Sequence, residues 1–340
     1  MNESMAQSSG ETRGGVGVIG VGRYVPAKRV DNDQIAKWTG VSAAAIEEKT
    51  GVMFRHIADA DETASGMSAE ASRHALEMAG VDPSKVGVII ACTFTGDYVY
   101  PAMACRVQKL IGAKNAGSFD IMANCTGFQV GLDIAASRMM TDKTIEYALV
   151  IGAALQSRFI NWNDANSAIY FGDGASAALL GRVPQGYGLI ATDVYSNPAA
   201  FESVRMRGGG SSHPMRADNV AQGLQYYEID GLEVWKQVVR YQPKSIRQAL
   251  GKVGMTTDDV NFFIFHQANL RLIEYLMAKM KKPMSMTHTN VAEIGNTADA
   301  SIGMALCDAV RAGELKRGDI VAVSGVGAGF TFGTSILRWY

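Results

Sequence analysis

Cys125 lies at a corner where a strand pattern changes into a helix pattern. The apolar run FDIMA ends at Asn124, and the helix pattern GFQVGLDIAASRM begins two residues after the cysteine. A thiol at this corner would lie at a helix N-terminus, where unpaired amides and the helix dipole favour a thiolate and can hold a developing oxyanion. Cys125 is therefore a candidate nucleophile, with a buried structural cysteine as the alternative. The other cysteines lie within apolar or helical runs and are expected to be unreactive: Cys92, Cys105 and Cys307.

Two further polar residues occupy similar corners. His266 ends the strand pattern NFFIF and precedes Gln267 and a helix pattern, so it can reach a crevice at the carboxyl edge of a sheet. Asn296 lies in GNT, before a helix of small residues, where it is either an N-cap or a hydrogen-bond donor to a substrate. Together with Cys125, these residue types would supply one nucleophile and two donors.

An internal repeat indicates how these corners would meet. The segment ALEMAGVDPSKV at 75–86 matches ALGKVGMTTDDV at 249–260, an offset of 249 − 75 = 174, and both lead into apolar strand patterns. We therefore predict two similar halves, residues 15–182 and 183–340, after a flexible tail at 1–14. A pseudo-twofold relation between the halves would bring the corners that carry the cysteine, the asparagine and the histidine to a common centre.

The elements that must position these residues alternate in type. Helix patterns with terminal glycines are followed by apolar runs, which favours an α/β protein with both faces of its sheet covered. Gly15, Gly17 and Gly20 match the dinucleotide motif G-x-G-x-x-G, but a polar tail precedes them and Pro26 follows, so we place them within a first strand. The polar excursion 196–223 is either a flap over a site or a plain surface loop.

Composition excludes several classes of function. The chain has 340 residues with 32 Lys+Arg and 33 Asp+Glu, a net charge of −1, so there is no basic excess for binding nucleic acid. It lacks an apolar run of ~18 residues, and we expect no membrane span. The spacing of the four cysteines suits neither a metal site nor a disulfide framework, which favours a reducing cytoplasm.

Five blocks of sequence occur in an order that resembles a known family. They are Cys125 with its surroundings, HQANLR (266–271), GNT (295–297), FGDG (171–174) and GAGF (327–330). Together they resemble β-ketoacyl-acyl-carrier-protein synthase III over about Gly15 to Tyr340. The resemblance implies an α/β thiolase fold, in which duplicated halves form a five-layer αβαβα architecture.

The resemblance also implies a reaction. Cys125 would take an acyl group from a coenzyme A or carrier-protein thioester, with the amides of Cys125 and Ala328 as the oxyanion hole. His266, in its neutral form, and Asn296 would hold the carbonyl of a malonyl thioester and stabilise the enolate that forms as CO₂ leaves. Attack of this enolate on the acyl-cysteine would give a β-ketoacyl product, in fatty-acid initiation or a related secondary pathway.

Binding roles follow from the same resemblance. The residues implied to contact coenzyme A or phosphopantetheine are Lys49, Arg158 and Asn269. Those implied to contact an acyl carrier protein are Lys236, Arg271 and Lys279, with ordinary solvated charge as the alternative. The family is homodimeric, and Tyr100 lies where a residue closes the acyl pocket of the other subunit. Thioesters are the implied substrates, with no separate cofactor and no metal.

Some positions depart from the family pattern. Ala45 replaces a tryptophan that stacks on adenine, and Lys49 replaces an arginine. An acyl donor bound to a carrier protein is therefore an alternative to acyl-CoA. Ala328 replaces a glycine but keeps its amide. Besides condensation, we consider acyl transfer from Cys125 to a hydroxyl, an amine or water, and a non-catalytic binding subunit. The presence of both His266 and Asn296 favours condensation.

Overall fold

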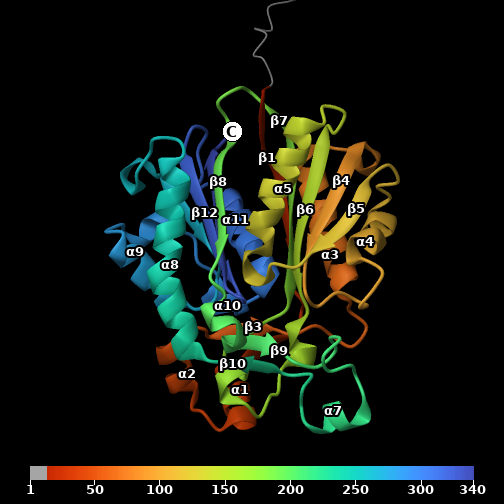
Figure 1. Ribbon diagram of the computed structural model, residues 1–340, viewed down its shortest axis with the longest axis vertical. Coiled ribbons are helices and arrows are strands. Elements are labelled where there is room, and N and C mark those ends of the chain that lie inside the picture. Colours follow the sequence, from red (N-terminus) through yellow and green to blue (C-terminus); the bar gives the residue numbers. More distant parts are fainter. Residues whose placement is uncertain (1–13) are drawn as a thin grey trace, which may run out of the picture.

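The computed structural model describes residues 14–340, so the tail predicted at 1–14 lies outside the described residues except for Gly14. Two β-sheets run side by side with helices between them and on their outer faces (Figure 1). Within the described range, the first sheet has the order β1 (Gly15–Tyr24), β7 (Gly174–Val183), β6 (Tyr147–Ala154), β4 (Val86–Cys92) and β5 (Gly117–Ile121). The second has the order β8 (Gly188–Ser196), β13 (Thr331–Arg338), β12 (Ile320–Gly327) and β11 (Phe262–Phe265).

The two sheets repeat one topology. In each, the first two strands of this order pair antiparallel, the next pair is also antiparallel, and the following pair is parallel. The counterpart of β5 in the second sheet is reduced to a parallel bridge between Phe263 and Thr287. The strands of the first sheet end at Val183 and those of the second begin at Gly188, so each sheet is built from one half of the sequence.

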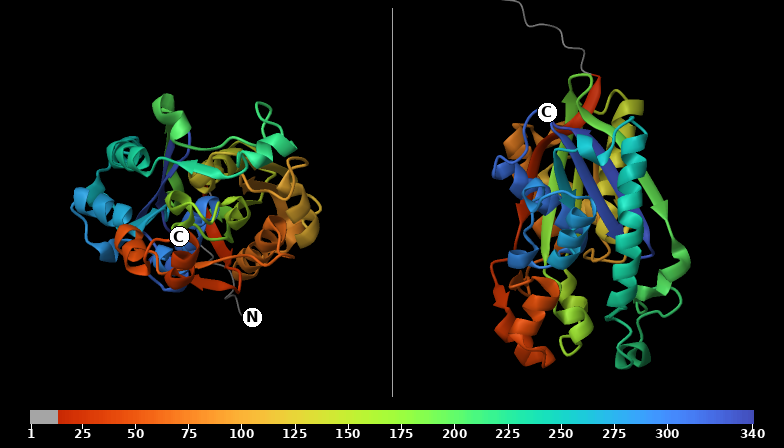
Figure 2. Two further views of the ribbon diagram at one scale, coloured as in Figure 1. Left: turned by 90° about the horizontal axis from the view of Figure 1, so that it is seen from below. Right: turned by 90° about the vertical axis from the view of Figure 1, so that its left-hand side faces the viewer.

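Helices form three layers around these sheets, as Figure 2 also shows. The central pair, α5 (Gly127–Thr141) and α11 (Ser301–Arg311), packs between the sheets. The outer layers are α3 (Ala64–Ala79) and α4 (Met103–Ile111) on the first sheet, and α8 (Gly231–Gly251) and α9 (Leu270–Lys279) beside the second. The architecture is therefore αβαβα, and the predicted thiolase fold is confirmed.

Shorter elements complete the chain. The strands are β2 (Arg29–Asp31), β3 (Phe54–His56), β9 (Val204–Met206) and β10 (Tyr227–Ile229), and the helices are α1 (Asn32–Thr39), α2 (Ala43–Thr50), α6 (Ala165–Ala168), α7 (Ala217–Ala221) and α10 (Val291–Ile294). The 3₁₀ turns are η1 (Pro83–Lys85), η2 (Asn124–Thr126), η3 (Gln156–Phe159), η4 (Pro198–Ser203), η5 (Thr257–Asp259), η6 (Met284–Met286) and η7 (Ala298–Ala300). Across residues 14–340, no helix is long and apolar enough to cross a membrane.

The glycines of the first strand allow a helix to approach closely. In β1, a Cβ added at Gly20 would lie 2.2 Å from the carbonyl oxygen of Ala75, and one at Gly22 would lie 2.1 Å from that of Ala71. Both carbonyls belong to α3, so the sheet and the helix are in backbone contact. The strand placement inferred from the sequence is confirmed, and these glycines do not form a phosphate loop.

The central helices are apolar on several faces because both sheets cover them. Phe128 and Leu132 of α5, and Ile302 and Leu306 of α11, are each at most 1% exposed and belong to one cluster with both sheets. Burial of each such side chain stabilises the fold by roughly 1.5–3 kcal/mol. This packing fixes the N-termini of α5 and α11, where the candidate residues lie.

Candidate active site

Each half of the molecule carries the same turn before its central helix. The turn η2 precedes α5, and η7 precedes α11, at an offset of 298 − 124 = 174. Their first residues, Asn124 and Ala298, both have positive φ, 48° and 39°. Asp299 is therefore the counterpart of Cys125 in the second half, and Asn296 lies three residues before Asp299.

Cys125 is half-buried at the N-terminus of α5, as the sequence predicts. Burial raises the pKa of its thiol, and negative charge at Asp299 would raise it further. Burial of the thiol therefore opposes the thiolate that the helix dipole favours.

His266 lies directly after β11, and its backbone N–H donates to the carbonyl of Ser324 at 3.0 Å. Its Nδ1 is 2.5 Å from the hydroxyl of Ser301, which also accepts the N–H of Gln267 at 3.2 Å. A Ser301 hydroxyl that donates its proton to Nδ1 would leave an N–H on Nε2, directed away from Ser301. Burial lowers the pKa of His266 to about 3, so the ring is neutral at physiological pH.

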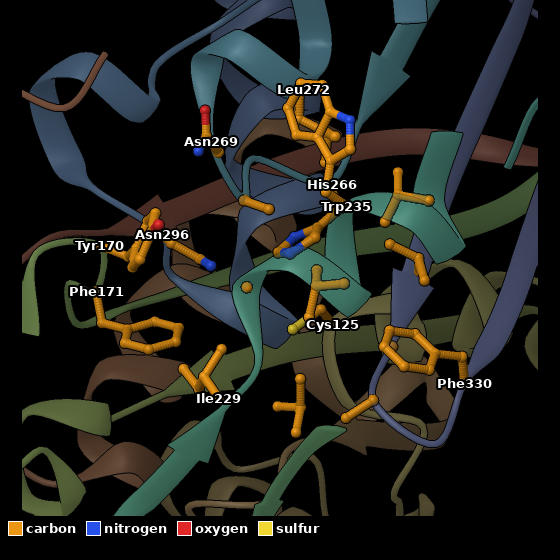
Figure 3. Close-up of a pocket in the computed structure, with 18 residues that line it drawn as sticks. Cys125, Tyr170, Phe171, Ile229, Trp235, His266, Asn269, Leu272, Asn296 and Phe330 are labelled. Atoms are coloured by element: carbon orange, nitrogen blue, oxygen red, sulfur yellow. The ribbon is translucent and has the colours of Figure 1, made fainter. Parts of the chain in front are cut away.

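Asn296 is held by hydrogen bonds that leave its amide nitrogen available. Its backbone bridges to Phe171, and its carbonyl accepts from Gly172 at 3.0 Å and from the side chain of Gln156 at 2.9 Å. Its Oδ1 accepts the N–H of Ala298 at 2.9 Å. Figure 3 shows the Nδ2 atom directed toward His266. Asn296 is thus a donor into the site rather than the cap of α11.

Ala328 lies in the turn between β12 and β13, next to the loop that carries the cysteine. A Cβ at Gly327 would lie 2.1 Å from the carbonyl oxygen of Ala123, and the side chain of Asn124 donates to the carbonyl of Ala328 at 3.1 Å. These contacts hold the two loops together, and Cys125 and Ala328 line the same cavity.

This cavity, of about 130 Å³, brings together Cys125, His266, Asn296 and Ala328 (Figure 3). The rest of its wall is largely apolar, with Val204, Ile229, Val234, Trp235, Leu272 and Phe330. A neutral imidazole, an amide and a thiol therefore face one another across a largely apolar cavity, where hydrogen bonds to developing charge are stronger than in water.

Asn269 also lines this cavity, and Lys49 and Arg271 lie close to it. The side chain of Asn269 caps α9 and donates to the carbonyl of Lys49 at 3.4 Å. Arg271 donates to the carbonyls of Glu48 at 3.0 Å and Glu47 at 3.3 Å, at the end of α2. These bonds join α2 to α9 at the rim of the cavity.

The remaining predicted binding residues lie outside the cavity lining. Arg158 donates to three carbonyls of the loop 59–62, the shortest bond being 2.7 Å to Glu62, so its guanidinium is engaged in the fold. Lys236 is exposed on α8 beside Glu233, and Lys279 donates to the carbonyl of Val239 at 2.6 Å. Both lysines are on helices that border the cavity.

Tyr100 is 84% exposed and does not line the cavity of its own chain. Val99 beside it is 95% exposed, and Met122, after β5, is 73% exposed. β5 is the last strand of the first sheet. Exposed apolar side chains therefore gather near an unpaired strand edge.

The excursion 196–223 contains the strand β9, which pairs with β10 just after it. Val204 of β9 and Ile229 of β10 both line the cavity. The excursion is therefore not a plain surface loop along its whole length, since its first part forms one wall of the site.

Four residues of the site were missed from the sequence. Ser301 orients His266, Trp235 lines the cavity, and Tyr227 and Asp299 are buried near Cys125. The repeat offset could have found Asp299, since 125 + 174 = 299. Trp235 and Tyr227 follow a weakly patterned excursion, and no local signal placed them at the site.

Two family models match the chain. The model described as 3-oxoacyl-[acyl-carrier-protein (ACP)] synthase III matches residues 119–198, and the model of its C-terminal part matches residues 250–339. A curated relative, β-ketoacyl-[acyl-carrier-protein] synthase III of Desulfitobacterium hafniense (strain Y51), is 37% identical over 324 residues, which cover 95% of this chain and 98% of the relative.

Solved structures agree with this similarity. The 3-oxoacyl-[acyl-carrier-protein] synthase III of Aquifex aeolicus VF5 superimposes with a TM-score of 0.87 at 34% identity, covering 96% of this chain and all of that one. The priming β-ketosynthase of the R1128 polyketide biosynthetic pathway gives a TM-score of 0.88 at 31% identity, with 96% of both chains covered.

The duplicated five-layer fold, with a cysteine, a histidine and an asparagine at the junction of its halves, defines a thiolase-fold condensing synthase, a transferase. Within this class, the chain belongs to the β-ketoacyl-[acyl-carrier-protein] synthase III family.

Proposed function

We propose that the protein joins an acyl thioester to a malonyl thioester with loss of CO₂, through an acyl group carried on Cys125. One observation carries the proposal: two uncharged groups, the imidazole of His266 and the amide of Asn296, share a cavity with the thiol. Decarboxylation itself creates the carbanion, so the site needs donors for an enolate rather than a charged base.

In the first half-reaction, the sulfur of Cys125 attacks the carbonyl carbon of the acyl thioester. The amides of Cys125 and Ala328 stabilise the resulting oxyanion. The carbon–sulfur bond to the carrier then breaks, and the leaving thiolate takes the proton that the thiol of Cys125 gives up. The raised pKa of this thiol is consistent with proton transfer during attack rather than before it.

In the second half-reaction, His266 and Asn296 donate hydrogen bonds to the thioester carbonyl of the malonyl group. The bond to the carboxylate carbon breaks, CO₂ leaves, and its electron pair forms an enolate. The enolate carbon attacks the acyl-thioester on Cys125, the sulfur leaves as a thiolate, and it takes up a proton. The product is a β-ketoacyl thioester.

Access for the thioester arm is proposed between α8 and α9. Trp235 and Leu272 line the cavity on these helices, and Asn269 presents its amide beside them. Asn269 and the adjacent Lys49 are therefore proposed to contact a pantetheine arm. Arg158 is less suited to this role, because its guanidinium is bonded to backbone carbonyls.

An acyl carrier protein is the proposed macromolecular partner. Lys236, Arg271 and Lys279 lie on α8 and α9, which border the cavity, and are proposed to meet its acidic surface. Lys236 suits this role best, because Arg271 and Lys279 donate to backbone carbonyls. The reaction is proposed to serve fatty-acid initiation or a related secondary pathway, in the reducing cytoplasm that free cysteines suit.

A homodimer is proposed across the edge of β5. An unpaired edge strand is a ready template for pairing with a second copy, and the exposed apolar residues Val99, Tyr100 and Met122 lie in the segments around it. In such a dimer, Tyr100 of each subunit would reach the acyl pocket of the other.

The test is a measurement of two products from one sample. The protein is incubated with an acyl-CoA and then with a malonyl thioester, and intact mass and released CO₂ are followed. We expect an acyl adduct that is absent from Cys125→Ala, followed by CO₂ release and a β-ketoacyl product. An adduct that passes to a hydroxyl, an amine or water without CO₂ release would favour the alternative of simple acyl transfer.

A further inference from the structure

Tyr227 carries a buried hydroxyl that has no hydrogen-bond partner among the described residues. Its side chain begins β10 and is 9% exposed. Its ring packs edge-on against Phe94 at 5.9 Å between centroids and lies against Phe171 at 5.4 Å. The aromatic contacts explain why the ring is there, but they leave the hydroxyl without a partner.

Tyr227 does not itself line the cavity of Cys125, but its ring packs against the cavity wall. Phe171, against which the ring packs, lines the cavity of Cys125. Ile229, two residues along the same strand and hence on the same face, also lines it (Figure 3). Burial raises the pKa of Tyr227, and negative charge at Cys125, Asp299 and Asp173 would raise it further.

Asp299 supplies a second unpartnered group. Its side chain is fully buried, and within residues 14–340 neither carboxyl oxygen has a hydrogen-bond partner. Its Oδ1 lies 3.0 Å from where a Cβ would stand on Gly127, at the start of the helix that presents Cys125. Burial raises its pKa to about 8, so at neutral pH it carries a proton that it can donate.

We propose that Tyr227 and Asp299 form a polar acyl-binding subsite next to Cys125, and that the acyl substrate carries a hydrogen-bond-accepting oxygen beyond its thioester carbonyl. The inference rests on the proposed function, because it assigns the chain that Cys125 accepts. A buried donor without a partner is costly, and an acceptor on the ligand removes that cost. Sites built to hydrogen-bond a substrate discriminate strongly against analogues that lack the polar group.

The experiment compares acyl-CoA substrates of equal chain length. Butyryl-CoA, 3-hydroxybutyryl-CoA, 3-oxobutyryl-CoA and 4-hydroxybutyryl-CoA are each offered to the native protein, and kcat/KM for acylation of Cys125 is measured by intact mass. We expect at least one oxygenated substrate to exceed butyryl-CoA by about tenfold or more. In Tyr227→Phe, which keeps the ring, this ratio should fall about tenfold.

Two further variants make the result specific. Asp299→Leu replaces the acid with an apolar side chain of similar shape, which removes the O–H and should also lower the ratio. Tyr195→Phe is the matched control, because the hydroxyl of Tyr195 donates to the carbonyl of Tyr241 at 2.8 Å, outside the site. That variant should keep the native ratio. Circular dichroism and thermal melting check that each variant is folded.

The proposal is overturned if butyryl-CoA matches or exceeds every oxygenated substrate, or if neither Tyr227→Phe nor Asp299→Leu changes the ratio. In either case acylation by butyryl-CoA followed by CO₂ release would leave the proposed function intact. Failure of the proposed function gives a different result, namely no adduct on Cys125 from any of these thioesters, or an adduct without CO₂ release.

Discussion

The reacting groups of this site are uncharged at rest, and burial is the common cause. It keeps the thiol of Cys125 protonated, lowers the pKa of His266 to about 3 and raises that of Asp299 to about 8. In a poorly solvated cavity, neutral donors cost little to hold in place, and they act most strongly when charge develops on the substrate.

The first prediction at this scale separates the two half-reactions. His266→Ala should lower CO₂ release from a malonyl thioester by about 100- to 1000-fold, because it removes one donor to the enolate. Acylation of Cys125, followed by intact mass, should persist, since the oxyanion hole is elsewhere. Asn296→Ala should behave in the same way. Equal loss of acylation and decarboxylation in both variants would contradict the assigned roles.

A second prediction concerns the pH dependence of decarboxylation. With a pKa of about 3, His266 stays neutral between pH 5 and about pH 8, so its titration should not appear in the rate of CO₂ release across that range. The measurement is the pH–rate profile of decarboxylation at saturating malonyl thioester. A rise with an apparent pKa near 6.5 would show that the ring is solvated and titrates normally.

A third prediction concerns the pH dependence of stability. The carboxyl of Asp299 has an ordinary pKa of 3.8 and a folded pKa of about 8, so between these values the folded chain holds a proton that the unfolded chain has released. The free energy of unfolding should therefore fall as pH rises through this window and level off above about pH 8. Asp299→Asn should reduce this slope by about 1 kcal/mol per pH unit in urea titrations. Equal slopes for the native protein and Asp299→Asn would contradict a raised pKa of Asp299.

At the scale of elements, the corners that carry Cys125 and His266 could be predicted because each follows a strand, β5 and β11. The strand expected before Asn296 is instead the short helix α10, which ends at Ile294. The repeat could be recognised where a glycine ends a helix shortly before an apolar strand, as at Gly80 and Gly254, both of which have positive φ. The β9–β10 wall was not predicted, since its strands are three residues each and are held by tertiary contacts rather than by a sequence pattern.

The close packing of β1 on α3 gives a prediction at this scale. Gly20→Ala should destabilise the protein by about 1–3 kcal/mol, because its Cβ would overlap the carbonyl of Ala75 and push the helix from the sheet. Gly251→Ala, at the end of α8 with open space around its Cβ, should be neutral or slightly stabilising. Thermal unfolding of both variants makes the comparison, and similar melting temperatures would contradict the packing argument.

At the scale of the whole molecule, one chain contains the catalytic groups but does not place Tyr100 near them. The sequence could not show this, because strand order decides which edge stays unpaired. β5 has no strand on its outer side in residues 14–340, and the exposed apolar residues lie in the segments next to it. The site is therefore expected to be completed by assembly.

The last prediction tests that assembly. Val99→Asp places a charge on a side chain that is 95% exposed in one chain, so the subunit should fold while the dimer dissociates. Light scattering after size exclusion measures the mass, and CO₂ release measures activity. Met140→Asp, at an exposed position on α5, is the control and should remain dimeric. A monomeric native protein would contradict the proposed dimer.

The left-handed turn shared by Asn124 and Ala298 shows how the two halves diverged. A non-glycine residue in this conformation costs roughly 1–2 kcal/mol. In the first half, the turn that contains this residue presents the thiol of Cys125. In the second half the same bend presents a buried acid instead. If Asp299 selects the acyl group as proposed, one backbone shape serves bond formation in the first half and substrate selection in the second.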